Sequence, residues 1–300
     1  MKTFNSMQAL AQEWLAQKKP LVKPATYAIY HSHIVTHILP AFERPEQLTE
    51  EHVQALVYTL IEQGLAIKSI KDILVVLKML GRYAAKWGLI PNPVWDIKLP
   101  AWQRSDAPQL LPSRAQKMLV QHCRTHFSFR NLGILLGLFT GLRIGELCAL
   151  RWRDFNRADG TLSVHSTVGR DYDGRPLVST PKTPSSIRIV PLPVGLKTFL
   201  SPFARAMEDD TFIVSGTTTP ISPRVLRQHF RRLCRSVGID HVRFHALRHS
   251  FATRCIAAGC DVKTVSSLLG HSSVSTTLEL YVHPTLDQKR RAVEKSGKLI

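Results

Sequence analysis

The sequence predicts a two-domain protein, mainly α-helical with a small antiparallel β-sheet (α+β) in its second domain. Three observations support this prediction. Apolar residues recur at helical spacing through residues 7–84. Five prolines then crowd residues 91–112, and the charge balance changes at the same place. Beyond them, short β-prone stretches between residues 160 and 192 interrupt a second helical part.

The first domain, residues 1–95, is expected to be a bundle of four short helices. Apolar residues three and four positions apart predict helices around residues 7–14 and 24–38. Thr49, which two glutamates follow, is the predicted N-cap of the third helix, and Ser69 is the predicted N-cap of the fourth.

The second domain, residues 109–285, is expected to follow a linker at 96–108, for which a long loop inside one domain is the alternative. Its helices are predicted at 113–125, with Ser113 as the cap, and at 131–139, 144–150, 222–236, 246–258, 262–269 and 274–281. Its strands are predicted at 161–166, 178–180 and 186–192, the last as a hairpin partner. Residues 286–300 form a predicted tail, with a last helix at 286–295.

Charge indicates a polyanionic partner. The chain has 40 Lys and Arg against 22 Asp and Glu, a net charge of +18. Residues 101–300 hold 29 of the basic and 14 of the acidic residues, so most of the excess lies in the second domain. A field of this size favours nucleic acid, although charge alone also fits a membrane surface. Arginine predominates in the excess, which favours forked contacts to phosphate.

Other features exclude several classes of protein. The five cysteines are scattered and form no CxxC pair, which predicts a reduced, cytoplasmic protein without a zinc site. No apolar signal core follows the N-terminus. The uncharged stretch 131–142 is too short to cross a bilayer, so we expect no membrane partner.

Three separated segments carry residues suited to attack on a phosphodiester: Thr-Gly-Leu-Arg-Ile-Gly-Glu-Leu (140–147), His-Ala-Leu-Arg-His (245–249) and Leu-Gly-His through Tyr (269–281). Two arginines can hold the non-bridging oxygens of one phosphate, because guanidinium forks match that geometry. A tyrosine can attack the phosphorus, and histidines can move protons.

These segments, with Pro-Lys-Thr and Arg-Ile-Val-Pro-Leu between them, resemble the tyrosine recombinases, the phage-integrase family of site-specific DNA recombinases. The resemblance covers about residues 109–285, and the helical first part is similar to the core-binding (SAM-like) DNA-binding domain of that family. It implies a catalytic domain in which strands are cut through a 3′-phosphotyrosine link, leaving a free 5′ hydroxyl. No metal, ATP or other cofactor is expected in such a reaction.

The resemblance implies a role for each matching residue. Arg143 and Arg248 correspond to the phosphate clamps, although Arg143 can instead pair with Glu146 on the same helix. Glu146 matches the acidic position that supports the active-site arrangement. Tyr281 lies ten residues past His271, as the family pattern requires, and corresponds to the nucleophile.

Each of the groups expected to transfer protons also has an alternative, structural interpretation. Lys182 lies in a turn between two predicted strands and matches the general acid for the departing 5′ oxygen; an exposed hairpin lysine is the alternative. His245 matches the group that accepts or shuttles the nucleophile's proton, and His271 the group that hydrogen-bonds the phosphate. A core histidine and a helix-capping histidine are the respective alternatives. His249 is expected to face elsewhere and to be structural.

The helix predicted at 222–236 carries a further cationic face. Arg224, Arg227 and Arg231 recur at helical spacing, which suits the DNA backbone better than a merely solvated face. The expected partners are double-stranded DNA and three further copies of the chain in a tetramer on DNA, with accessory DNA-bending or directionality factors as candidates. The tail at 286–300 either docks on a neighbouring protomer or is a frayed end.

The function predicted is that of an integrase, a site-specific DNA recombinase of a mobile element in the cytoplasm, associated with the nucleoid. Within the same family, a Xer-type enzyme for chromosome dimer resolution is the alternative. A topoisomerase-like nicking enzyme shares the chemistry. A non-catalytic regulator is the alternative of another class, because residues 262–281 look somewhat like a helix-turn-helix.

Overall fold

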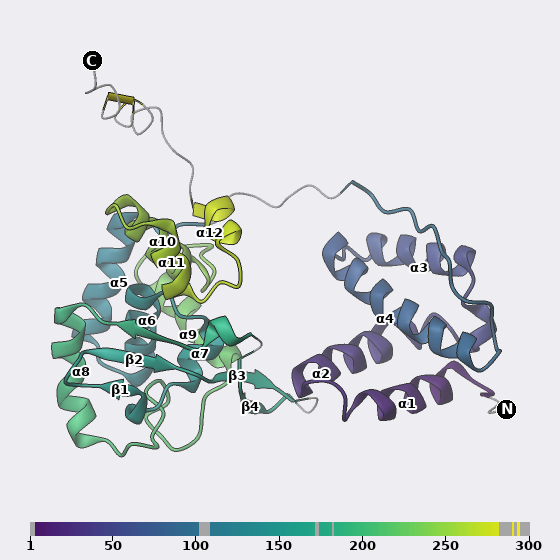
Figure 1. The fold of residues 1–300 in the computed structure, drawn as a ribbon, viewed down its shortest axis with the longest axis horizontal. Coiled ribbons are helices and arrows are strands. Elements are labelled where there is room, and N and C mark those ends of the chain that lie inside the picture. Colours follow the sequence, from purple (N-terminus) through teal and green to yellow (C-terminus); the bar gives the residue numbers. More distant parts are fainter. Residues whose placement is uncertain are drawn as a thin grey trace. The chain divides into compact units, whose positions relative to one another are not determined.

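The chain folds into two compact units (Figure 1). The computed structural model describes residues 4–101, 109–171, 174–181, 183–281, 290 and 293–294. The first unit lies within residues 1–105, with the short segment 170–175, and the second comprises the rest. Within the described ranges, no helix combines the length and apolar character needed to span a bilayer. The domain boundaries given above stay predictions.

The first unit is a helical bundle. Its elements are α1 (Met7–Lys18), α2 (Pro24–His33), the π-helix η1 (Ile34–Ile38), the 3-10 helix η2 (Pro45–Gln47), α3 (Glu50–Glu62) and α4 (Ile67–Lys86). Thr49 caps α3 as predicted, because its side chain accepts the backbone N–H of His52. The predicted cap at Ser69 is wrong: Ala66 is the N-cap of α4, since the apolar stripe of this helix already begins at Ile67.

The start of the proline-rich stretch packs on this bundle. The backbone N–H of Asp96 donates to Glu50 at 3.0 Å, and Lys98 exchanges two hydrogen bonds with Gln54. Trp95 packs against the apolar core of the bundle. Residues 91–101 therefore lack regular secondary structure but are docked along α3.

The second unit holds eight α-helices in its described part. They are α5 (Ser113–Thr125), α6 (Phe129–Thr140), α7 (Ile144–Ala149), α8 (Val194–Ala206), α9 (Pro223–Ser236), α10 (Ala246–Ala257), α11 (Val262–Leu269) and α12 (Val274–Tyr281). Helix α8 was not predicted, and Pro112 rather than Ser113 is the N-cap of α5. The predicted helix at 286–295 falls mostly outside the described residues.

Five short strands lie beside these helices: β1 (Phe155–Asn156), β2 (Thr161–Val164), β3 (Thr167–Arg170), β4 (Pro176–Ser179) and β5 (Arg188–Pro191), with the 3-10 helices η3 (Trp152–Asp154) and η4 (Pro184–Ser186). One antiparallel sheet has the order β1-β2-β5, and β3 pairs with β4 separately. The stretch 186–192 was predicted as a hairpin partner with no strand named for it. Strand β5 pairs antiparallel with β2, because Val190 and Leu162 then meet in the core.

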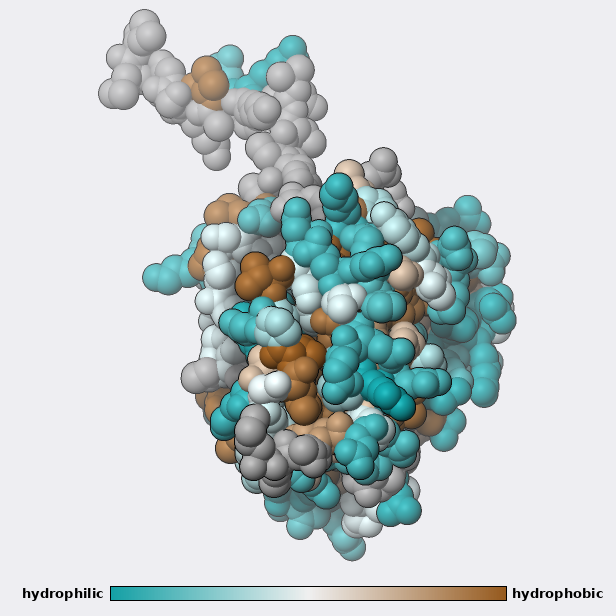
Figure 2. All heavy atoms as spheres, turned by 90° about the vertical axis from the view of Figure 1, so that its right-hand side faces the viewer, coloured by the Kyte–Doolittle hydropathy of each residue, from teal (hydrophilic) through white to brown (hydrophobic). Residues whose placement is uncertain are grey.

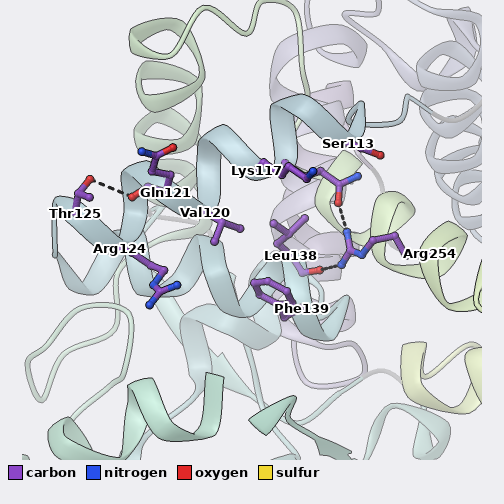
Figure 3. Close-up of a pocket in the computed structure, with 10 residues that line it drawn as sticks. Ser113, Lys117, Val120, Gln121, Arg124, Thr125, Leu138, Phe139 and Arg254 are labelled. Carbon is purple, nitrogen blue, oxygen red and sulfur yellow. Dashed lines mark hydrogen bonds between the residues drawn. The ribbon is translucent and has the colours of Figure 1, made fainter. Parts of the chain in front are cut away.

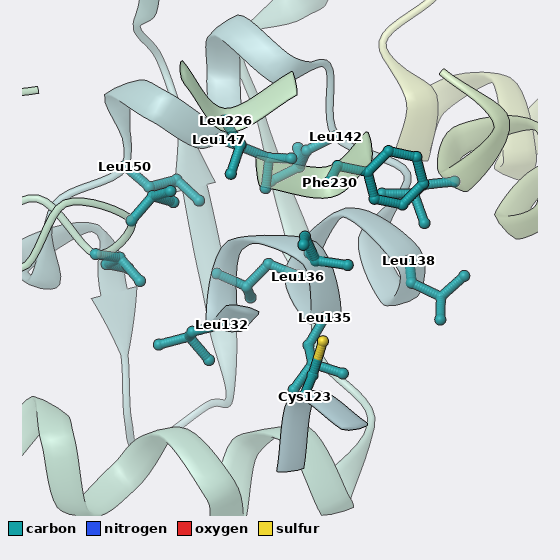
Figure 4. Packing of buried hydrophobic residues seen from close by; sticks show 14 of the residues in the cluster. Cys123, Leu132, Leu135, Leu136, Leu138, Leu142, Leu147, Leu150, Leu226 and Phe230 are labelled. Atoms are coloured by element: carbon teal, nitrogen blue, oxygen red, sulfur yellow. The ribbon is translucent and has the colours of Figure 1, made fainter. Parts of the chain in front are cut away.

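Helix α6 forms the centre of the second unit. Its apolar residues point in several directions and contact α5, α7, α9 and α10 (Figure 4), as expected of a helix that is hydrophobic on all sides. It ends at Gly141, which has the left-handed φ of 65°. The chain then turns directly into Arg143 and α7, so the rigid end of α6 positions the first predicted clamp.

The face drawn in Figure 2 is mostly hydrophilic. Figure 2 shows one face on which hydrophilic side chains predominate and hydrophobic ones gather in smaller patches between them. Exposed apolar residues in the described chain include Leu21, Ile29, Val75 and Ile189. Scattered apolar residues of this kind are normal on a folded protein.

Gly141→Ala should destabilise the second unit more than Gly238→Ala. Both glycines have positive φ, which costs an L-residue about 1–2 kcal/mol. A Cβ at position 141 would also lie 2.5 Å from Phe251 and 2.9 Å from Leu269, whereas position 238 is open. We expect an additional loss of about 1–3 kcal/mol from overpacking at position 141. Hydrogen exchange of the α6 and α10 amides in the full chain measures the difference; equal protection in both variants would contradict it.

Candidate active site

Arg143 is the N-cap residue of α7. Its backbone N–H and its Nη1 both donate to Glu146, each at 2.8 Å, which confirms the ion pair within the helix. Its Nη2 donates to the carbonyl of Gly270 at 2.7 Å. The Arg143 side chain keeps 38% of its surface exposed. The ion pair thus aims the guanidinium at the end of α11 without burying it.

Arg248 approaches the same place from α10. It is 2% exposed, and its Nη1 and Nη2 donate to the carbonyls of Gly141 and Leu269, both at 2.8 Å. Burial, and then the neighbouring Arg143, lower its pKa to about 9. The guanidinium therefore stays charged at neutral pH, in surroundings that favour an added anion.

Arg188 is a site residue that the sequence analysis quoted but did not assign. Its Nη2 and Nη1 donate to the two oxygens of Glu146 at 2.9 and 3.2 Å, and its Nε donates to the carbonyl of Leu268 at 2.7 Å. Burial alone would raise the pKa of Glu146, but Arg188 and then Arg143 bring it below its ordinary value. Glu146 is thus an ionised carboxylate shared by two arginines.

These contacts have one common target. Arg188, Arg248 and Arg143 donate to the successive carbonyls of Leu268, Leu269 and Gly270. The last carbonyls of a helix lack intrahelical partners and carry partial negative charge. Three arginine side chains from distant segments of the chain therefore hydrogen-bond to the same helix end. A Cβ at position 270 would lie 2.8 Å from Arg188, so the glycine makes this approach possible.

The predicted histidines lie around this cluster. His271 follows Gly270, and its Nδ1 is 2.8 Å from the buried hydroxyl of Thr277. His245 is the N-cap residue of α10; the residue is exposed, although its ring is partly desolvated. Burial of each ring comes first in lowering both pKa values to about 4, and nearby positive groups, including Arg143 and Arg248, lower them further. Both rings are neutral at neutral pH.

Tyr281 ends α12 and faces the cluster. It is 7% exposed and packs with Phe251, Val265 and Leu269. Its hydroxyl is 2.7 Å from Nδ1 of His249, so the expectation that His249 faces elsewhere is wrong. Burial raises the pKa of Tyr281, and the charges of Arg248 and Arg143 oppose that rise.

The remaining predicted residues are placed in part. Arg227 and Arg231 of α9 line a cavity of about 660 Å³ together with His245 and Arg248, whereas Arg224 lies one turn earlier on the helix. Lys182 lies outside the described residues, so its role stays a prediction. In the part of the chain that is described, no cluster of three or more His, Cys, Asp or Glu is arranged to hold a metal ion.

A larger cavity, about 830 Å³, does not coincide with this site. It is lined by residues of α5, α6 and α10, including Lys117, Arg124 and Phe139 (Figure 3). Arg254 lies at one end of it and donates to Gln116 and to the carbonyl of Leu138. None of the predicted catalytic residues lines it. The candidate active site is therefore identified by the side chains that meet at the end of α11, and not by the volume of the cavity.

Comparison with known proteins now decides the family. The model of the phage integrase family matches residues 110–288, more than half of the chain, and that of the phage integrase N-terminal SAM-like domain matches residues 6–61. The chain belongs to the phage integrase family. It is therefore a tyrosine recombinase, an enzyme that cuts and rejoins DNA strands. Family membership decides against the non-catalytic regulator.

This integrase-family enzyme has similar relatives along nearly its whole length. The ICEBs1 integrase of Bacillus subtilis (strain 168) is 26% identical over 98% of this chain and 83% of that protein. A XerC-like tyrosine recombinase of Caldanaerobacter subterraneus subsp. tengcongensis is 28% identical over 92% of this chain and 78% of that protein.

Solved structures share its fold. The Tn1549 transposon integrase in complex with transposon right end DNA superposes with a TM-score of 0.76 at 21% identity, covering 96% of this chain and 98% of that one. A lambda integrase tetramer bound to a Holliday junction gives a TM-score of 0.68, also at 21% identity, over 92% and 77% of the two chains. At this identity the likeness establishes the fold.

Glu146→Gln should destabilise the second unit by about 3–5 kcal/mol at pH 7, because it leaves two buried or half-buried arginines without their shared carboxylate. The folded-state pKa of Glu146 is depressed, so its contribution is present above about pH 4.5 and is lost as pH falls through the folded value.

Denaturant unfolding between pH 3 and pH 7 checks this expectation. In the wild type, the free energy of unfolding should fall with pH partly because Glu146 becomes protonated. The variant should not show that part of the fall. Glu208→Gln, an exposed carboxyl of the same unit, is the control. A Glu146→Gln curve that parallels that of the wild type at every pH would rule out the proposed ionised state.

Proposed function

We propose that this chain is the integrase of a mobile genetic element and recombines specific DNA sites through a phosphotyrosine formed on Tyr281. The observation that carries the proposal is the convergence of Arg143 and Arg248 on the neighbouring carbonyls of Gly270 and Leu269, with Tyr281 packed in the same cluster as Leu269. The named relatives support the biological role, since one is an integrase and one structural neighbour is a transposon integrase on DNA.

The two arginines bind the scissile phosphate in this mechanism. Both guanidinium groups are held by carbonyls before DNA arrives, so little reorganisation is needed when negative charge develops at the phosphorus. Tyr281 attacks the phosphorus in line with the departing 5′ oxygen. The energy of the phosphodiester is kept in the tyrosyl ester, and the 5′ hydroxyl of a second strand later reverses the step.

The other groups act on protons and on the oxygens of the phosphate. His271, neutral at pH 7, hydrogen-bonds the phosphate beside the arginines, and His245, also neutral, is the group that the family resemblance gives for the nucleophile's proton. Lys182 supplies a proton to the departing 5′ oxygen. Arg224, Arg227 and Arg231 contact the DNA backbone, because α9 adjoins the cavity that His245 and Arg248 line.

Strand exchange between two DNA duplexes requires several active sites. We infer that four copies assemble on two sites, as the lambda integrase tetramer on a Holliday junction does. Accessory DNA-bending or directionality factors, tail docking of residues 286–300 and action on nucleoid DNA in the cytoplasm belong to the same proposal. DNA flanking the gene, with attachment-like duplications, would identify the sites.

A Xer-type role in resolving chromosome dimers is the second candidate. The 28% identity to a XerC-like recombinase along 92% of this chain favours it, and a topoisomerase-like activity would use the same tyrosine. Recombination between the ends of an excised element supports the integrase. Recombination only at a chromosome-terminus site supports the Xer role, and relaxation of plasmids that lack any site supports the nicking enzyme.

Tyr281→Phe should abolish the covalent complex on a nicked suicide DNA substrate, because the ring stays and the attacking oxygen is lost. Arg143→Ala and Arg248→Ala should lower the rate of covalent complex formation by about 10²–10³ while DNA binding persists. Arg153→Ala, at a surface ion pair with Asp210, is the control for loss of an arginine. Denaturing gels resolve the adduct. Wild-type protein that forms none on its own attachment DNA would defeat the proposed function.

Replacement of Arg224, Arg227 and Arg231 by Gln should weaken DNA binding at all sequences alike. Each lost phosphate contact lowers the slope of log affinity against log salt by roughly 0.9. Arg232→Gln, on another face of α9, is the matched control and should change the slope less. Binding titrations across a salt series measure both. A triple variant with the wild-type slope would remove α9 from the DNA interface.

A further inference from the structure

One contact links the proposed nucleophile to a histidine outside the predicted set. The hydroxyl of Tyr281 lies 2.7 Å from Nδ1 of His249, and their ring centroids are 5.4 Å apart. His249 follows Arg248 on α10, whereas Tyr281 ends α12. The contact therefore joins two helices and places an imidazole nitrogen directly on the oxygen that attacks the phosphorus.

The surroundings fix the protonation of both partners. Tyr281 is buried, which raises its pKa, so its hydroxyl keeps the proton at neutral pH. His249 is half-buried, and burial and then Arg248 lower its pKa, so its ring is neutral. The titratable and charged groups that face His249 are His245 and Arg248 on α10 and Tyr281 on α12. Of the two neutral tautomers, the one with its proton on Nε2 accepts the Tyr281 hydroxyl at Nδ1, and transfer of the phenol proton to Nδ1 requires that tautomer.

We propose that His249 is a catalytic residue that accepts the proton of the Tyr281 hydroxyl as this oxygen attacks the DNA phosphorus. The inference rests on the proposed function, because it requires Tyr281 to be the nucleophile. In the step, the bond from Tyr281 Oη to phosphorus forms and the bond from phosphorus to the 5′ oxygen breaks. The phenol proton moves to Nδ1 of His249, and the 5′ oxygen takes a proton from Lys182.

The geometry distinguishes His249 from the histidine that the family resemblance suggests for this role. Among the described hydrogen bonds, the Tyr281 hydroxyl contacts His249 and not His245. The His245 ring stands edge-on to that of His249, with centroids 4.4 Å apart, and lines the cavity beside Arg227 and Arg231. Bound phosphate favours the new imidazolium, since an opposite charge raises the pKa of a histidine.

His249→Asn tests the assignment. Asn keeps an acceptor oxygen near the position of Nδ1 but does not take up a proton. We expect covalent complex formation at pH 7 to slow by about 10²–10⁴, the usual contribution of a positioned base, with unchanged DNA affinity. The rate should also rise about tenfold per pH unit toward ionisation of the phenol, whereas that of the wild type should be nearly flat. His126→Asn, an exposed histidine after α5, is the control.

A substrate with sulfur in place of the bridging 5′ oxygen separates the two proton transfers. A thiolate leaves without a proton because thiols ionise near pH ~8.5. The substrate should restore the rate of Lys182→Met but leave the defect of His249→Asn. Restoration of both variants, or His249→Asn within about threefold of the wild type with the same pH profile, would overturn the inference. An adduct formed by Tyr281→Phe would instead overturn the proposed function.

A second measurement covers the case in which His249→Asn folds poorly. A fluorinated tyrosine at position 281 ionises at lower pH and needs less help from a base. In a chain that carries this fluorinated tyrosine, the rate of covalent complex formation should depend less on His249. His249→Gln should therefore slow that chain less than it slows the chain with natural tyrosine. An equal loss in both backgrounds would mean that His249 only shapes the site.

Discussion

The end of helix α11 is the constraint on which the catalytic unit depends. Its last carbonyls, with that of Gly270, receive hydrogen bonds from Arg188, Arg248 and Arg143. The preceding carbonyls, of Ser266 and Ser267, are taken by the backbone N–H groups of His271 and Gly270. Every carbonyl of this helix end that lacks an intrahelical partner therefore accepts a hydrogen bond. The three segments that contain these arginines, which are far apart in sequence, are held next to one another by those bonds.

This arrangement holds more positive than negative charge. Glu146 neutralises part of the charge of Arg143 and Arg188. Among its described hydrogen bonds, Arg248 contacts only carbonyl oxygens; burial and then the charge of Arg143 lower its pKa, and Glu146 opposes that shift. In the proposed reaction a phosphate oxygen supplies negative charge beside Arg248, so the electrostatics of the folded site favour the substrate.

The sequence predicted correctly those elements in which the apolar spacing and the capping residues indicate the same bounds. Helix α11 was predicted with its observed ends because an amphipathic stripe lies between Asp261 and Gly270, which cap it. Helix α8 was missed because Gly195 and Pro202 resemble breakers, whereas burial of Leu200 outweighs them. The motifs pointed to Arg143 and Arg248, the two arginines proposed to bind the phosphate. They did not find Arg188 or His249, whose partners lie 80 and 32 residues away and depend on the fold.

In this site the arginines are charged, whereas the histidines and the tyrosine are neutral. The arginines carry the positive charge, and the three histidines near them are neutral because burial and the same arginines lower their pKa values. Burial also keeps the Tyr281 hydroxyl protonated, so solvent hydroxide is poorly placed to remove the proton. In the proposed reaction the phenol loses that proton as it attacks. The imidazole of His249, which burial and then Arg248 keep neutral, contacts the hydroxyl and accepts its proton beside the arginines proposed to bind the phosphate.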